Sequence, residues 1–140
     1  MGVSTYNFAD VILTVGPYHV TGFASGSVIK VERNADSWTF QPNVDGGGTR
    51  SKSNNRSGRI TFSLAQSSGS NDDLSILFQI DDLTGGGAVP VSVTDLNGRS
   101  LHAAETAWIV KPPAADYGVE SVGREWILET DTLVHNVGGN

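Results

Sequence analysis

The residue types that most often carry out chemistry are present in this chain, but their spacing matches no catalytic or metal-binding motif. The three histidines, His19, His102 and His135, fall in three separate predicted strands. None of them has a second ligand at the spacing of a metal site. We therefore expect separate histidines and no metal ion.

The carboxylates, serines and glycines also match no catalytic, calcium-binding or phosphate-binding motif. The pairs Asp72–Asp73 and Asp81–Asp82 lack the spacing of a calcium loop, and we assign them to the two ends of a helix. No serine stands in a Gly-x-Ser-x-Gly turn, and the glycine runs Gly46–Gly48 and Gly85–Gly87 are not followed by Lys-Ser/Thr. The chain has no cysteine, which excludes a thiol nucleophile. We predict a protein that is not an enzyme and has no cofactor.

Charge is distributed unevenly along the chain. With nine basic and fifteen acidic residues the net charge is −6, which argues against a protein that coats nucleic acid by neutralising phosphates. Residues 49–59 contain four basic residues and no acid, so the remainder has five basic and fifteen acidic residues, a balance of −10. One basic segment is therefore set into an acidic protein; its basic residues are Arg50, Lys52, Arg56 and Arg59.

Length and hydropathy indicate a single domain. We expect residues 1–140 to form one unit, since the chain is too short for two ordinary domains. No apolar run approaches the roughly 18 residues of a membrane span. The first residues lack the basic and apolar regions of a secretory signal.

Apolar and polar residues alternate along most of the chain, which predicts strands with one buried face. Ile60, Phe62 and Leu64 are one example. Pro90 suggests an edge position or a strand start, and we assign Trp38, Trp108 and Trp126 to the core. The fold class is mainly β, an antiparallel β-sandwich or barrel. The predicted strands are Asp10–Val15, Tyr18–Phe23, Val28–Arg33, Trp38–Gln41, Arg59–Ala65, Val89–Thr94, Leu101–Val110, Arg124–Thr130 and Leu133–Val137.

One segment has a helical period instead. Leu74, Leu77 and Phe78 share one face of a helix of about three turns over residues 71–81, which ends before the run of glycines at 85–87. Ser70 or Asn71 is positioned to cap its first turn. We expect this helix to cover one end or one face of the sandwich.

The polar run over residues 42–58 predicts a long, flexible basic loop. Three interpretations are open: a nucleic-acid contact, a solvated loop without a role, or a contact with an acidic surface on another copy. The first would require aromatic stacking partners, and none lies between Gln41 and Arg59. Charge alone does not decide between the other two.

Several blocks of the sequence together resemble one family, and the resemblance extends from Tyr6 almost without a break to the end of the chain. These blocks look like the tail tube proteins of contractile-tailed, myovirus-type bacteriophages. They are Val31–Trp38, Thr49–Gly58, Trp108–Pro113, Gly123–Thr130 and Val137–Asn140.

The resemblance implies a sandwich protomer with one flanking helix, six copies of which form a ring. Such rings stack into a hollow tube inside the contractile sheath, and genome DNA passes through the lumen without specific binding. The implied partners are further copies of the chain, the sheath protein, a baseplate hub or initiator, and the tape measure protein, with no membrane. The implied location is the virion, after assembly in the host cytoplasm.

The family's long loop after the early strands commonly packs on an adjacent subunit or ring. The resemblance therefore assigns the inter-subunit contact to Asp45–Gly58, with Arg59 less certain because it starts the next strand. The residues implied are Asp45, Arg50, Lys52, Asn54, Arg56 and Arg59. Two alternatives stay open: a ring-forming tube protein of a type VI-like secretion or bacteriocin apparatus, and a carbohydrate-binding β-sandwich module.

Overall fold

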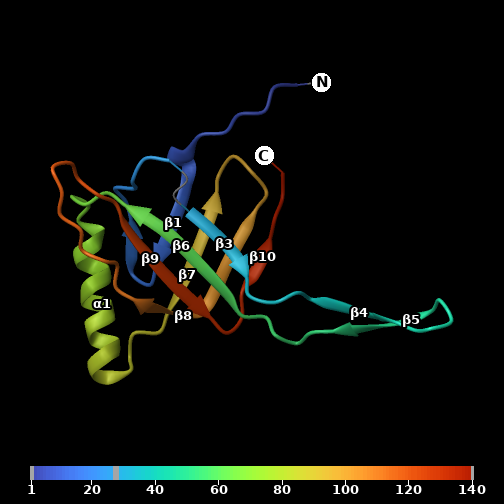
Figure 1. Ribbon diagram of the computed structural model, residues 1–140. Helices are drawn as coiled ribbons and strands as arrows, with labels where there is room; N and C mark the ends of the chain where they lie inside the picture. The colour runs from blue at the N-terminus through green and yellow to red at the C-terminus, as the bar shows by residue number, and fades with distance from the viewer. Residues whose placement is uncertain (1, 27–28, 140) are drawn as a thin grey trace.

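The computed structural model describes residues 2–26 and 29–139, which form one 3-10 helix, ten strands and one α-helix (Figure 1). All nine predicted strands are present; Val28, the first residue of one of them, lies outside the described residues. The elements are η1 Phe8–Asp10, β1 Val11–Val15, β2 Tyr18–Val20, β3 Ile29–Arg33, β4 Trp38–Pro42, β5 Gly48–Lys52, β6 Gly58–Leu64, α1 Ser70–Thr84, β7 Val89–Asp95, β8 Leu101–Lys111, β9 Arg124–Thr130 and β10 Val134–Asn136.

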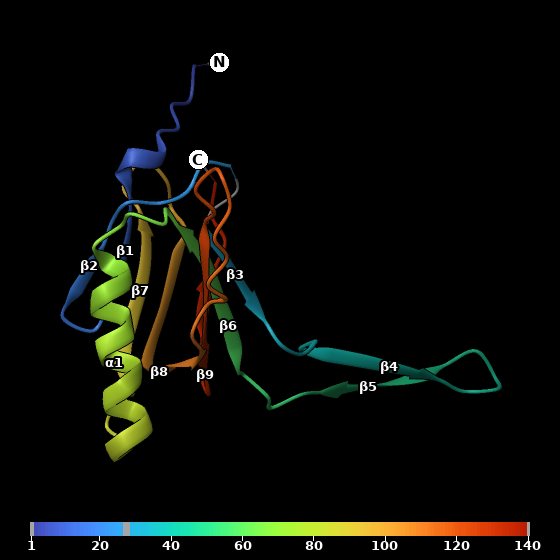
Figure 2. The same cartoon turned by 60° about the vertical axis from the view of Figure 1, so that its left-hand side comes forward.

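Eight of these strands form one antiparallel sheet in the order β2-β1-β7-β8-β9-β6-β3, with β10 also paired to β8. Strand β8 is long enough to serve both halves of the sheet: its first part pairs with β7 and β10, and its last part with β9. In Figure 1, β3, β6 and β9 cross in front of β1 and β7, and Figure 2 separates these halves. The predicted antiparallel, mainly β architecture with one helix is confirmed.

The core lies between the two halves of the sheet and holds the residues that the alternation predicted. Ile60, Phe62 and Leu64 of β6 are buried, and Phe62 pairs across the sheet with Trp126 of β9. The same cluster contains Leu13 of β1. Trp126 is buried, which confirms its assignment to the core, whereas Trp108 is only half-buried.

Pro90 lies at the start of an interior strand. Strand β7 is flanked by β1 and β8, so the edge position is wrong and the strand start is confirmed. The missing N–H is tolerated because the register against β8 shifts between Val89 and Val91. The carbonyl of Pro90 accepts a hydrogen bond of 2.7 Å from the amide of Gly16.

Helix α1 extends over the predicted segment and buries Leu74 and Leu77 in the core. The predicted caps are wrong: Gly69 is the N-cap and makes no side-chain capping bond. Ser70 and Asn71 instead attach the helix to the sheet. Ser70 Oγ accepts from the amide of Thr21 at 3.0 Å, and Asn71 Oδ1 accepts from Trp126 Nε1 at 2.9 Å. In the described part of the chain, no helix combines the length and the apolar character needed to cross a membrane.

Strands β4 and β5 form a separate two-stranded sheet that projects from the rest of the molecule (Figures 1 and 2). Within the polar run predicted to be a loop, Gly48–Lys52 is therefore a strand. Sequence periodicity does not reveal it because its residues are all polar or glycine, and its partner is the strand before the run. We call β4, β5 and the turn between them, residues 38–52, the arm, and the remaining structure the body.

Candidate functional site: a projecting arm

The arm is a β-hairpin with no buried residue. Its register pairs Trp38 with Lys52, Phe40 with Arg50, and Pro42 with Gly48, and every residue of both strands is exposed. An isolated hairpin of this length is at best marginally stable in water. The arm is thus a small sheet whose residues are all exposed in their own chain.

The two faces of the arm differ in chemistry, because side chains alternate along each strand and paired residues share a face. One face, which we call the aromatic–cationic face, carries Trp38, Phe40, Pro42, Arg50 and Lys52. The opposite, polar face carries uncharged hydroxyl and amide side chains: Thr39, Gln41, Thr49 and Ser51.

The aromatic–cationic face is ordered by contacts between its own members. The Arg50 guanidinium lies 3.9 Å from the centroid of the Trp38 ring, a cation–π contact. The Phe40 ring lies over Gly48, where a Cβ atom would overlap it. Trp38 and Phe40 nevertheless remain 46% and 66% exposed. A large aromatic surface beside two cations is therefore left open to solvent.

The tip of the arm is closed by a short turn. The amide of Asn43 donates to the carbonyl of Gly47 at 2.7 Å, and Gly46 has φ +98°, a left-handed conformation that favours glycine. Asp45 Oδ1 accepts from the amide of Gly47 at 3.4 Å. The carboxylate of Asp45 thus has a local role in the turn, and Val44 at the tip is fully exposed.

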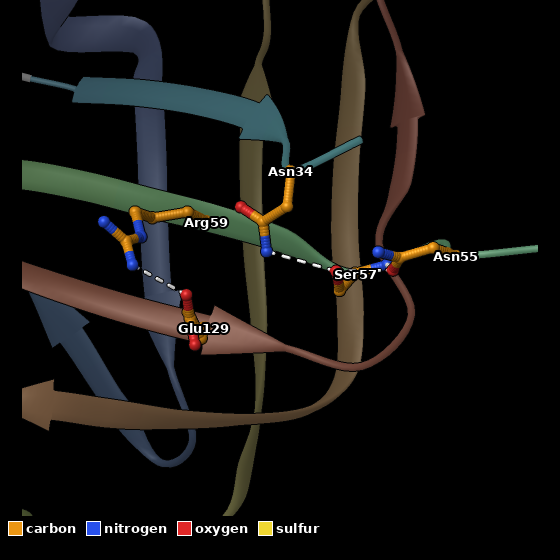
Figure 3. A network of polar contacts seen from close by, with 5 residues as sticks. All are labelled: Asn34, Asn55, Ser57, Arg59 and Glu129. Atoms are coloured by element: carbon orange, nitrogen blue, oxygen red, sulfur yellow. Dashed lines mark hydrogen bonds and ion pairs between the residues drawn. The ribbon is translucent and has the colours of Figure 1, made fainter. Parts of the chain in front are cut away.

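Hydrogen bonds between its two sides hold the base of the arm together (Figure 3). Asn34 Nδ2 donates to Ser57 Oγ at 3.1 Å, and Ser57 Oγ donates to Asn55 Oδ1 at 2.6 Å. The amide of Ser53 donates to the carbonyl of Ser37 at 2.8 Å. No tight turn joins β3 to β4. Instead, residues 34–37 form a bend that directs the chain away from the body, and these bonds hold the two sides of the arm together at that point.

Leu133 anchors this base to the far end of the chain. Its amide donates to the carbonyl of Arg56 at 2.9 Å, and its carbonyl accepts from Arg33 Nη2 at 2.9 Å. Its side chain is 1% exposed and lies against Gly58, where any Cβ would overlap it. The direction in which the arm leaves the body is therefore fixed on both sides of its base.

The structure brings the six residues assigned by resemblance to four different places. Arg50 and Lys52 lie on the aromatic–cationic face, and Asp45 lies at the tip. Asn54 and Arg56 are exposed at the base.

Arg59 stands apart from the other five, because it lies in the sheet of the body. Its Nη2 is 2.7 Å from Oε1 of Glu129, its cross-strand partner on β9 (Figure 3). Its charge is therefore neutralised within the same chain.

Trp38 and Phe40 are the site residues that sequence reasoning missed. Trp38 was assigned to the core, which is wrong, because it lies on a hairpin that the body does not cover. The expectation that the basic segment lacks aromatic neighbours is also wrong, because its aromatic neighbours come before residue 41 in the sequence. Pairing of β4 with β5 places Phe40 directly opposite Arg50. Only this pairing reveals the aromatic neighbours, since residues 48–52 have no apolar alternation of their own.

The histidines are not all separate. His102 on β8 and His135 on β10 are cross-strand partners with 2.8 Å between their Nδ1 atoms, whereas His19 lies exposed on β2. Burial lowers the pKa of His102, and the neighbouring His135 lowers it further. Among the described residues no group of three or more His, Cys, Asp and Glu is arranged to hold a metal ion.

Two comparisons by sequence assign the chain to a family. Residues 3–138 match the family described as bacteriophage PhiTE tail tube protein. The chain is also 32% identical over 123 residues to Structural protein ORF10 of Pseudomonas phage KPP10, which covers 86% of this chain and 71% of that relative.

Solved structures show where the same fold occurs. A chain of the anti-feeding prophage cap, the AFP tube terminating cap, aligns with a TM-score of 0.61 at 13% identity, over 97% of this chain and 93% of that one. A chain of the PVC extracellular contractile injection system, in its sheath/tube terminator in the extended state, aligns with 0.60 at 14% identity, over 96% and 99%.

The PVC sheath–tube complex in the extended state gives 0.58 at 15% identity, over 94% of this chain and 91% of that one. At such identities the likeness concerns the fold alone. The family match, in contrast, covers almost every residue. The chain therefore belongs to the bacteriophage PhiTE tail tube protein family, whose members are structural components of the phage virion.

Proposed function

We propose that this protein is the repeating subunit of a contractile phage tail tube, and that the arm joins each copy to a neighbour. In this proposal six copies form a ring, and rings stack into a hollow tube inside the sheath. The observation that carries it is the arm, fifteen residues that are held at the base by hydrogen bonds and are all exposed in their own chain. Together with membership of a tube protein family, this favours an arm that is covered by another copy.

The sheet edges of the body support ring formation. Strands β2 and β3 end the sheet order, so each presents one side to which a further strand can pair. If β2 of one copy approaches β3 of the next, the contact joins two different surfaces. Contacts of this type close into rings when the rotation permits.

The acidic composition supports passage of DNA. With a net charge of −6, a lumen built from this chain repels phosphates and does not retain the duplex. Association with a sheath fits the solved structures of similar fold, whose descriptions name sheath and tube together. A baseplate initiator and a tape measure protein complete the set of proposed partners.

An injection-device tube is the second candidate, because those solved structures come from an extracellular contractile injection system and an anti-feeding prophage. Mass spectrometry of purified particles separates the two: a phage tube subunit is found in DNA-filled virions. A carbohydrate-binding module, the third alternative, is not favoured by any of the relatives.

Electron microscopy of the purified full-length chain, and of virions that carry its variants, tests the proposal. We expect rings or tubes with an axial hole, and we expect the triple variant Arg50→Glu, Lys52→Glu, Arg56→Glu to lose them while its circular dichroism is unchanged. The control places three acids on the polar face of the arm, as Thr39→Glu, Thr49→Glu and Ser51→Glu, and should assemble. Normal tubes from the triple variant would refute the role of the arm.

A further inference from the structure

The outer face of helix α1 is apolar and exposed in its own chain. Ile76, Ile80 and Leu83 follow one another at helical spacing and are 50%, 44% and 85% exposed, although Leu74 and Leu77 on the opposite side are buried. Helix α1 therefore has two apolar faces. The body covers only one of them, and we call the other the α1 stripe.

Charge distinguishes the α1 stripe from an ordinary exposed apolar patch. The helix carries four carboxylates, Asp72, Asp73, Asp81 and Asp82, and no basic residue. Asp72 is exposed one turn before Ile76, and Asp82 is exposed on the flank of the helix, whereas Asp81 accepts a hydrogen bond from the amide of Gly87. The surface is thus apolar along its middle and negative at its borders.

The aromatic–cationic face of the arm has the complementary chemistry. It presents Trp38 and Phe40 beside Arg50 and Lys52, so it is apolar and positive. Its two positive charges lie together, because Arg50 and Lys52 are two strand residues, about 7 Å, apart and Arg50 stacks on Trp38, the cross-strand partner of Lys52.

The position of the two surfaces excludes contact within one chain. In both views the arm leaves the body on the side away from α1 (Figures 1 and 2), and its direction is fixed at the base by Leu133. A second copy can supply the helix. Because the arm and α1 are different surfaces at opposite sides, each copy can give one contact and receive another, as rings and stacks require.

We propose that the aromatic–cationic face of the arm docks on the α1 stripe of a second copy of the chain. The proposal deepens the proposed function and rests on it, since it names the surface that the arm meets. Trp38 and Phe40 pack on Ile76, Ile80 and Leu83, while Arg50 and Lys52 lie against the acidic residues of the helix.

Charge exchange tests this pairing in virions and in purified protein. The arm variant Arg50→Glu, Lys52→Glu and the helix variant Asp72→Lys, Asp82→Lys should each lose tubes by electron microscopy. Their combination in one chain should recover them, because both charges are then reversed together. All four positions are exposed, so thermal unfolding of each variant should match that of the parent chain.

Cross-linking tests the same contact in particles that assemble normally. The chain has no cysteine, so Gln41→Cys on the polar face of the arm and Gln79→Cys beside the α1 stripe introduce the only two thiols and leave the docking residues unchanged. In assembled particles a bis-maleimide should join them into a ladder of covalent oligomers. Gln41→Cys combined with Leu96→Cys, at an exposed position away from the helix, should give no ladder.

The outcomes separate this inference from the function on which it rests. If the arm variant assembles normally, the arm has no role between copies and the proposed function is wrong on that point. If the arm variant fails but the helix variant forms normal tubes, the arm docks elsewhere and only the inference is overturned. Normal tubes of the helix variant that do not bind sheath would assign the α1 stripe to the sheath, which also overturns it.

Discussion

The body and the arm of this protein bury their apolar residues in different ways. In the body, Phe62 and Trp126 face each other across two strands and are almost completely covered. In the arm, Trp38 and Phe40 lie two residues apart on β4, which pairs with β5, and remain exposed. The same alternation of side chains therefore stabilises a folded chain in one region and presents a surface in the other. Within one chain, only the body covers its large apolar side chains.

The largest expected effect is on the body. Trp126→Ala should lower the free energy of unfolding by about 3–5 kcal/mol, because it leaves a cavity in the core and removes the donor to Asn71. Urea denaturation of the monomer measures this. Trp38→Ala, the same substitution in the arm, should change it by no more than about 0.5 kcal/mol. Equal losses in the two variants would remove the distinction between the regions.

The junction between the regions should respond less strongly. Gly58→Ala puts a methyl group where Leu133 lies and should cost about 1–3 kcal/mol through overpacking. Gly26→Ala serves as the comparison: its positive φ makes it strained, but nothing lies within 4 Å of its Cβ position. Denaturation midpoints of the two variants report the difference. If Gly58→Ala is as stable as the parent chain, Leu133 does not clamp the base.

A smaller effect is expected from pH, and it should affect the body only. The pKa of His102 is lower in the folded chain than its ordinary value of 6.5, so the unfolded chain binds more protons as the pH falls. The stability present at neutral pH should decrease as the pH falls below about 6.5, and His102→Gln should weaken this dependence. Denaturation at pH 7.5 and at pH 5 measures it. An unchanged slope in the variant would mean that another group is responsible.

The smallest effect on folding should come from removing the arm itself. Replacing residues 38–52 by two glycines should leave the unfolding free energy of the body within about 1 kcal/mol, because only a solvent-exposed hairpin is lost and loop closure depends weakly on length. Differential scanning calorimetry gives the value. A loss of several kcal/mol would show that the arm belongs to the folding unit of the body.

Much of the body was predictable, because its residues report their burial directly. Ile60, Phe62 and Leu64 alternate with polar neighbours, and the helix around Leu74 has its own period. The arm was not predictable in the same way. Strand β5 consists of Gly48, Thr49, Arg50, Ser51 and Lys52, and such residues form a strand only because Trp38–Pro42 pairs with them.

Contacts between distant segments also explain why the histidines and the helix caps differ from what the sequence predicts. His102 and His135 meet because β10 pairs with β8, a register that no local pattern specifies. Ser70 and Asn71 have side chains that commonly cap helices, but here these side chains accept hydrogen bonds from Thr21 and Trp126 instead. Local preference therefore predicts the role of such residues correctly only where no other part of the fold bonds to their side chains.

The anchor at Leu133 has a mechanical consequence. Force applied to the tip reaches the body through β3 and β6, but also through two hydrogen bonds at the base, one from the amide of Leu133 to the carbonyl of Arg56 and one from the Arg33 side chain to the carbonyl of Leu133. Leu133 lies between β9 and β10, directly before β10, and both of these strands are paired to β8. A pull is thereby distributed into the middle of the sheet, and the edge strand β3 is not peeled off alone. A tube held together by such arms would bear tension and torsion through its protomers as well as across their interfaces.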